Sequence, residues 1–139
     1  MASHLAEAGV RPHLVLCSSG LRARETLALV LPSLGQELEI NIEPELYTFD
    51  AARVLERLRR VPDEVSSVLV VGHNPALQEA ALAIASTGKD RERVAEKLPT
   101  GALVVLDLPD APWGSIGDGG GELARLVEPR ALRTEPGDE

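Results

Sequence analysis

Apolar residues along the chain follow two alternating patterns. Short runs of consecutive aliphatic residues, or residues that alternate between apolar and polar, predict strands, and apolar residues that recur every three or four positions predict helices. Strands are expected at residues 13–18, 40–43, 67–71, 100–108 and 123–127, and helices at 5–9, 21–34, 50–60 and 75–85. Strands that alternate with helices predict an α/β fold with three layers, α/β/α. A Gly/Pro-rich turn between the last two strands predicts that they pair antiparallel, which makes the sheet mixed.

The strand at residues 67–71 is followed at once by polar residues. Four consecutive aliphatic residues predict that this strand is buried on both faces. Gly72 ends the run, and Pro75 can begin a helix because its missing N–H would be unpaired there. His73 therefore lies at the carboxyl end of a strand, where open α/β sheets bind ligands and helix N–H groups favour an anion. The residues that recur at helical spacing after Pro75 are expected to face the core: Leu77, Ala81, Leu82 and Ala85.

A second strand end carries a similar set of polar residues. The strand at residues 13–18 ends in Ser18, and Arg22 follows in the next predicted helix. Because the carboxyl ends of parallel strands share one edge of a sheet, Arg22 and His73 are expected to converge there. An arginine guanidinium matches the oxygens of a phosphate, and Ser18 can add a hydroxyl. Taken singly, each residue has a simpler role, Arg22 as an exposed helix position and His73 as a cap of its own turn.

Cys17 offers a different chemistry, which we reject. Cysteine-dependent phosphatases place five residues between the thiolate and the arginine that binds phosphate, whereas four residues separate Cys17 from Arg22. Cys17 also ends an apolar strand, where burial keeps a thiol protonated and unreactive. We therefore expect Cys17 to be a residue of the core.

Composition limits the remaining functions. The 139 residues are expected to form a single domain over residues 1–133, followed by a disordered tail at 134–139. A net charge of −8 argues against nucleic-acid and anionic-membrane partners, and no apolar run is long enough to cross a bilayer. The single cysteine excludes an internal disulfide, and His4, His13 and His73 lack the spacing of metal ligands. A cytoplasmic protein without metal or cofactor is expected.

Several motifs, in order along the chain, carry a resemblance to one family. Ser18–Thr26 resembles the Ser-Pro-x-x-Arg-Ala-x-x-Thr motif of the histidine phosphatase superfamily, whose members share the phosphoglycerate mutase-like fold. Val70–Pro75 resembles the second histidine motif of that superfamily. Pro99–Ala102 and Val127–Leu132 are similar to segments of the small SixA-type phosphohistidine phosphatases. The resemblance spans residues 2–132, and the ordered set of motifs is more specific than any one of them.

The resemblance implies a phosphate pocket made of two histidines and two arginines. In this family one histidine attacks phosphorus and becomes phosphorylated, and water then releases phosphate. His73 matches the second histidine, which holds the phosphoryl oxygens, and Arg22 matches one of the two arginines. Ser18 is placed beside them, and Glu45 lies in the loop where the family tends to keep a proton donor. The implied partner is a phosphorylated protein carrying phosphohistidine, or a small phosphoester.

One motif of the family does not occur in this sequence. The nucleophilic histidine of the family stands in an Arg-His-Gly or Arg-His-Ala motif, and neither His4 nor His13 follows an arginine. In the family this motif ends a first, inner strand, which the resemblance places between the strands at 67–71 and 100–108. We expect an N-terminally incomplete domain that leaves backbone groups of those strands unpaired and does not hydrolyse phosphohistidine. The alternative is a pseudophosphatase that binds phosphate or a phosphoprotein.

Overall fold

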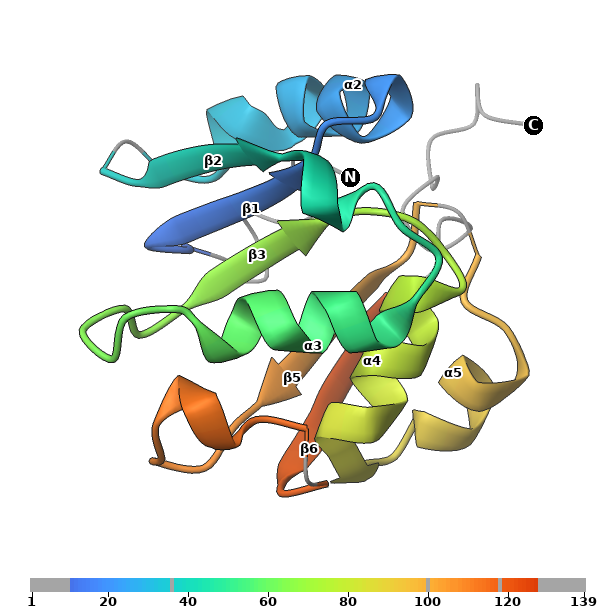
Figure 1. The fold of residues 1–139 in the computed structure, drawn as a ribbon. Coiled ribbons are helices and arrows are strands. Elements are labelled where there is room, and N and C mark those ends of the chain that lie inside the picture. The colour runs from blue at the N-terminus through green and yellow to red at the C-terminus, as the bar shows by residue number, and fades with distance from the viewer. Residues whose placement is uncertain (1–10, 36, 100, 118, 128–139) are drawn as a thin grey trace.

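Within the described residues, six strands form two small sheets. The computed structural model describes residues 11–35, 37–99, 101–117 and 119–127 (Figure 1). The strands are β1 Leu14–Ser18, β2 Glu39–Glu43, β3 Val68–Val71, β4 Ala85–Thr87, β5 Leu103–Asp107 and β6 Gly121–Val127. The first sheet is wholly parallel, with the order β2-β1-β3. The second has the order β4-β6-β5, and its antiparallel β5–β6 pair is the mixed edge that the sequence predicts.

Helices cover both faces of the first sheet, so the predicted three-layer α/β/α architecture is confirmed (Figure 1). The α-helices are α2 Leu21–Val30, α3 Ala51–Arg59, α4 Ala76–Ile84 and α5 Arg91–Glu96, and the short 3-10 helices are η1 Leu31–Ser33, η2 Pro44–Leu46 and η3 Trp113–Ser115. Asp50 caps the start of α3, because the backbone N–H of Ala52 donates to Asp50 Oδ1 over 3.0 Å.

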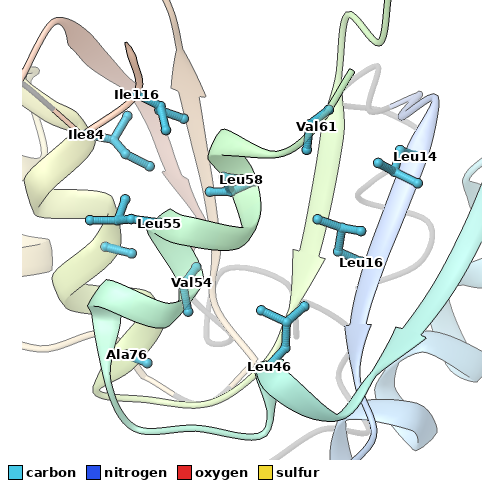
Figure 2. Packing of buried hydrophobic residues seen from close by; sticks show 11 residues of the cluster. Leu14, Leu16, Leu46, Val54, Leu55, Leu58, Val61, Ala76, Ile84 and Ile116 are labelled. Atoms are coloured by element: carbon cyan, nitrogen blue, oxygen red, sulfur yellow. The ribbon is translucent and has the colours of Figure 1, made fainter. Parts of the chain in front are cut away.

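The strand β1 lies at the centre of the hydrophobic core, because its side chains alternate between the two faces of the sheet. Leu14 and Leu16 pack on one face with residues of α3, α4 and η2 (Figure 2). Val15 and Cys17 pack on the other face with residues of α2, and this second cluster also takes in β5 and β6. All five residues of β1 are buried. The strand that ends in Ser18 is therefore fixed from both sides.

The sheet is divided at the place where the family resemblance puts an additional strand. β3 is hydrogen-bonded to β1 alone and β5 to β6 alone, and no strand among the described residues joins them. The prediction that β3 is buried on both faces is wrong, because Val68–Val71 are all only partly buried. An apolar strand that is paired along one edge only has less cover than an inner strand of a continuous sheet.

The packing of the C-terminal half corrects one further prediction in part. Of the four residues predicted to face the core, Ala81 and Ala85 are buried, whereas Leu77 and Leu82 are only partly buried. The helix α4 also buries three residues outside that set: Ala76, Ala80 and Ile84. Because α4 is apolar almost all round, periodicity alone did not select the face that packs on α3. The charged segment at 89–97 contains the helix α5, which buries Val94. The predicted helix at 5–9, His4 and the tail at 134–139 lie outside the described residues.

Candidate active site

Three loops meet at one edge of the parallel sheet, and each follows the carboxyl end of a strand. The strand register aligns Ser18 of β1 with Glu43 of β2, and Cys17 with Val71 of β3. The chain continues from these strands into residues 19–20, 44–50 and 72–75 respectively. In a parallel α/β sheet this edge is the usual place for a ligand.

Ser18 and His73 are in direct contact at this edge. Ser18 Oγ lies 2.8 Å from His73 Nε2, within hydrogen-bonding distance. The backbone N–H of Gly20 donates to the same hydroxyl oxygen over 3.0 Å. Ser18 is fully buried, and it is the one buried polar residue among those described. The hydroxyl therefore joins the turn after β1 to the turn after β3, and holds the imidazole ring at Nε2.

Gly20 is packed closely against the imidazole ring. A Cβ atom at this position would lie 3.1 Å from His73 Cε1 and 3.2 Å from Nε2, closer than ordinary van der Waals contact. The backbone of Gly20, at φ −63° and ψ 147°, is extended and open to any residue. A glycine is therefore needed at this position because the His73 ring lies so close, and the backbone conformation does not require one. Sequence reasoning did not assign Gly20 to the site.

Two aromatic side chains of the loop after β2 contact the same imidazole. The Tyr47 ring is stacked on His73 with ring centroids 4.9 Å apart and planes 26° from parallel. Phe49 approaches edge-on, with centroids 6.5 Å apart and planes at 79°. Both residues were missed in the sequence, although the parallel-strand argument applied to Ser18 and His73 also places the loop after β2 at this edge.

Arg22 lies in the first turn of α2, two residues after Gly20, and its side chain is exposed. Within the described residues, its guanidinium forms no hydrogen bond or ion pair. The start of α2 has no side-chain cap and no acidic residue in its first turn, so its N–H groups and Arg22 all favour an anion. The structure joins Ser18 to His73, and among the described residues no hydrogen bond links the Arg22 side chain to that pair.

Curated proteins and solved structures resemble this chain over most of its length. No family model matches the chain. The Mycobacterium tuberculosis protein Rv1276c is 36% identical over 120 residues, covering 84% of this chain and 73% of that protein. The Mycobacterium leprae protein ML1117 is 32% identical over 119 residues, covering 84% and 71%. Both are named as uncharacterized proteins, so they establish kinship and no activity.

Solved structures with a similar fold carry family names. A protein assigned as phosphohistidine phosphatase SixA from Agrobacterium tumefaciens is 26% identical, with a TM-score of 0.73. The match covers 92% of this chain and 75% of the Agrobacterium chain. The protein histidine phosphatase SixA complexed with tungstate is 25% identical, with a TM-score of 0.73, covering 95% and 78%. A SixA assignment from Nakamurella multipartitia, 23% identical with a TM-score of 0.69, adds support for the fold. The chain belongs to the histidine phosphatase superfamily.

The family resemblance suggests Glu45 as a proton donor. Glu45 forms no hydrogen bond with Ser18 or His73 within the described residues. Its carboxylate forms an ion pair with Arg60, and both side chains are largely exposed. The neighbouring Glu43 forms a more buried, two-pronged ion pair with Arg57 of α3. The hydrogen bond from Arg57 to Glu43 raises the pKa of the guanidinium further above its ordinary value. This second pair fixes the end of β2, and with it the loop that carries Tyr47.

Among the described residues, the other candidate nucleophiles, Cys17 and His13, lie within the core and away from the site. Cys17 is fully buried, as predicted, and burial raises the pKa of its thiol while Arg24 lowers it in part. His13 precedes β1 and is bonded to Ser66, so it lies at the opposite end of the strand from Ser18. Among the described residues, no group of three or more His, Cys, Asp or Glu is arranged to bind a metal ion.

Proposed function

We propose that the chain carries the phosphate-binding part of a SixA-type phosphohistidine phosphatase, which removes a phosphoryl group from a protein phosphohistidine or another phosphomonoester. The observation that carries the proposal is the Ser18–His73 hydrogen bond at the start of α2. Three features lie at this edge of the sheet: a helix start without an acidic residue, an unpaired arginine and a histidine held by a hydrogen bond. Together they suit a dianionic group such as a phosphoryl group.

Each residue has a definite part in holding the phosphoryl group. Phosphoryl transfer gains most from fixed positive groups that meet charge on the three peripheral oxygens. Arg22 supplies a planar guanidinium, and the first-turn N–H groups of α2 supply backbone donors. If the Ser18 hydroxyl donates to His73 Nε2, the ring proton of the neutral imidazole is on Nδ1. That nitrogen has no hydrogen bond within the described residues and can donate to a phosphoryl oxygen.

The structural neighbours support an oxyanion as the ligand. One of them is named as a protein histidine phosphatase complexed with tungstate, a tetrahedral oxyanion like phosphate. We extend this to the present chain as a site for phosphate, with phosphorylated protein as the partner. None of the helices in the described ranges is long and apolar enough for a membrane crossing.

The nucleophile is the part of the mechanism that these 139 residues do not supply. The family uses a histidine that follows an arginine, and no Arg-His pair occurs in the sequence. We therefore expect this chain to bind phosphate without hydrolysing phosphohistidine. Glu45 stays our proposal for the proton donor, which requires that it leave its exposed ion pair with Arg60 when a substrate binds.

Binding and hydrolysis can be tested separately. Inorganic phosphate and tungstate should bind the wild-type chain in an NMR titration, with shifts at the His73 ring. His73→Gln should abolish the binding, whereas His13→Gln, at the far end of β1, should leave it intact. The site assignment is wrong if His73→Gln binds phosphate as tightly as wild type.

A phosphate-release assay on a phosphohistidine protein addresses the reaction. The 139-residue chain should release no phosphate, and a version with a family first strand bearing Arg-His fused before residue 1 should release it. Release by the unmodified chain would mean that the nucleophile lies elsewhere. No release by the fused version, with phosphate binding intact, would favour the pseudophosphatase alternative.

A further inference from the structure

Two of the three aromatic residues in the chain surround His73, and both are exposed. The sequence contains one Trp, one Tyr and one Phe. Trp113 packs against the core, and its indole N–H donates to the carbonyl of Val65 over 2.8 Å. Tyr47 and Phe49 are instead 62% and 66% exposed. Core packing therefore accounts for Trp113 and leaves the position of the other two unexplained.

The loop that carries these rings is anchored on both sides. Leu46, the residue before Tyr47, is buried and points into the cluster of β1 and α3 (Figure 2). The Tyr47 backbone N–H donates to the carbonyl of Pro44, and the Asp50 backbone N–H donates to Thr48 Oγ1 over 3.0 Å. Exposed rings on an anchored loop present a fixed apolar surface, at a smaller entropic cost on binding than mobile side chains would incur.

The position of the two rings relates them to the phosphate site. Tyr47 is stacked on the imidazole that Ser18 holds at Nε2, so its ring lies next to the group proposed to contact the phosphoryl oxygens. A group attached to a phosphoryl group that His73 holds would lie near the two rings that contact this imidazole. Aromatic rings favour planar partners that can stack or meet them edge-on.

We propose that Tyr47 and Phe49 select the leaving group, and favour a phosphoryl group attached to a planar ring over one attached to an aliphatic group. This inference rests on the proposed phosphate site. The imidazole of a phosphohistidine is such a ring, and so is the phenol ring of an aryl phosphate. The two residues are therefore specificity-determining residues that contact the substrate beside its phosphorus.

Three anions separate the phosphate site from the aromatic preference. Inorganic phosphate reports on the site alone, and phenyl phosphate and cyclohexyl phosphate carry the same charge on rings of similar size. Dissociation constants from NMR titrations should show phenyl phosphate binding about three- to tenfold tighter than cyclohexyl phosphate. The quantity to compare between variants is the dissociation constant of cyclohexyl phosphate divided by that of phenyl phosphate.

Variants assign the preference to the two rings. Tyr47→Leu and Phe49→Leu keep apolar volume and remove the aromatic ring, and each should bring the ratio towards one. Leu29→Ala, which removes an exposed apolar side chain near the far end of α2, should leave the ratio at its wild-type value. Thermal melts confirm that each variant is folded, which exposed positions should permit.

The outcomes are distinct. A wild-type ratio near one, with inorganic phosphate bound, would overturn the aromatic inference and leave the proposed function standing. A high ratio that survives both leucine variants would also overturn it, because the preference would then come from other residues. Failure of the wild-type chain to bind inorganic phosphate would overturn the proposed function and this inference with it.

Discussion

Replacing Gly20 by alanine should separate the stability of the fold from the geometry of the phosphate site. The backbone at Gly20 is one that alanine adopts without strain, and a Gly→Ala change at such a position stabilises a protein by about 0.4–1 kcal/mol through the unfolded chain. The new methyl group would lie 3.1–3.2 Å from two atoms of the His73 ring, which must yield by a few tenths of an ångström. The ring would then move away from Ser18.

The size of the effect follows from the bond that is disturbed. The Ser18–His73 hydrogen bond is 2.8 Å long, and a bond of this kind contributes about 0.5–1.5 kcal/mol. The stability lost with this hydrogen bond is close to the stability gained through the unfolded chain. The free energy of unfolding of Gly20→Ala, measured in urea, should therefore stay within about 1 kcal/mol of the wild-type value. Phosphate binding should weaken by about two- to tenfold, because the displaced imidazole no longer meets the anion.

A second glycine supplies the control. Gly114 has no atom within 4 Å of its notional Cβ, so Gly114→Ala should leave phosphate binding unchanged. Calorimetric titration with inorganic phosphate and urea unfolding would be measured on both variants. If Gly20→Ala bound phosphate as tightly as wild type and Gly114→Ala, the His73 ring would have no part in holding the anion where we place it.

Two further predictions concern groups beside the site. Cys17 should react slowly with thiol reagents at neutral pH, and it should make stability depend on pH above about 8.5, the ordinary thiol pKa. Because burial raises the pKa of the folded thiol, the unfolded thiol loses its proton first, and stability falls by up to about 1.4 kcal/mol per pH unit relative to Cys17→Ala; equal pH profiles would contradict this. Glu43→Gln should cost about 1.5–3 kcal/mol in urea unfolding, because Arg57 is left charged with only 12% of its side chain exposed. Glu45→Gln, at an exposed pair, should cost about 0–1 kcal/mol, and equal costs would show that burial of the Glu43 pair is unimportant.

The sequence predicts the strand ends of the site well, because their signals are local. A run of aliphatic residues that stops at Ser18, and another that stops at Gly72, mark where β1 and β3 end. Parallel pairing then brings both ends to one edge, a consequence of topology that needs no knowledge of side-chain positions. The antiparallel pair β5–β6 was signalled by its Gly/Pro-rich turn in the same way.

Features that depend on contacts between distant parts of the chain were harder to predict from the sequence. The short helix α5 buries one residue, Val94, so it has almost no apolar periodicity to detect. The partial exposure of β3 depends on which strands pair with it, and the composition of the strand is that of an inner one. Tyr47 and Phe49 stand in a loop, where side-chain direction follows from the anchoring of Leu46 and has no period in the sequence.

The alternation of side chains along β1 separates the packing demands of neighbouring residues. Leu16 shares its cluster with α3 and η2, while Val15, its neighbour in the chain, shares one with α2 and β6. A change in volume at either position has to be absorbed on its own face, because close-packed interiors yield little. A substitution at Leu16 therefore has to be compensated by residues of one cluster, and a substitution at Val15 by residues of the other. The strand β1 can keep Ser18 beside His73 only while the packing on both of its faces is preserved.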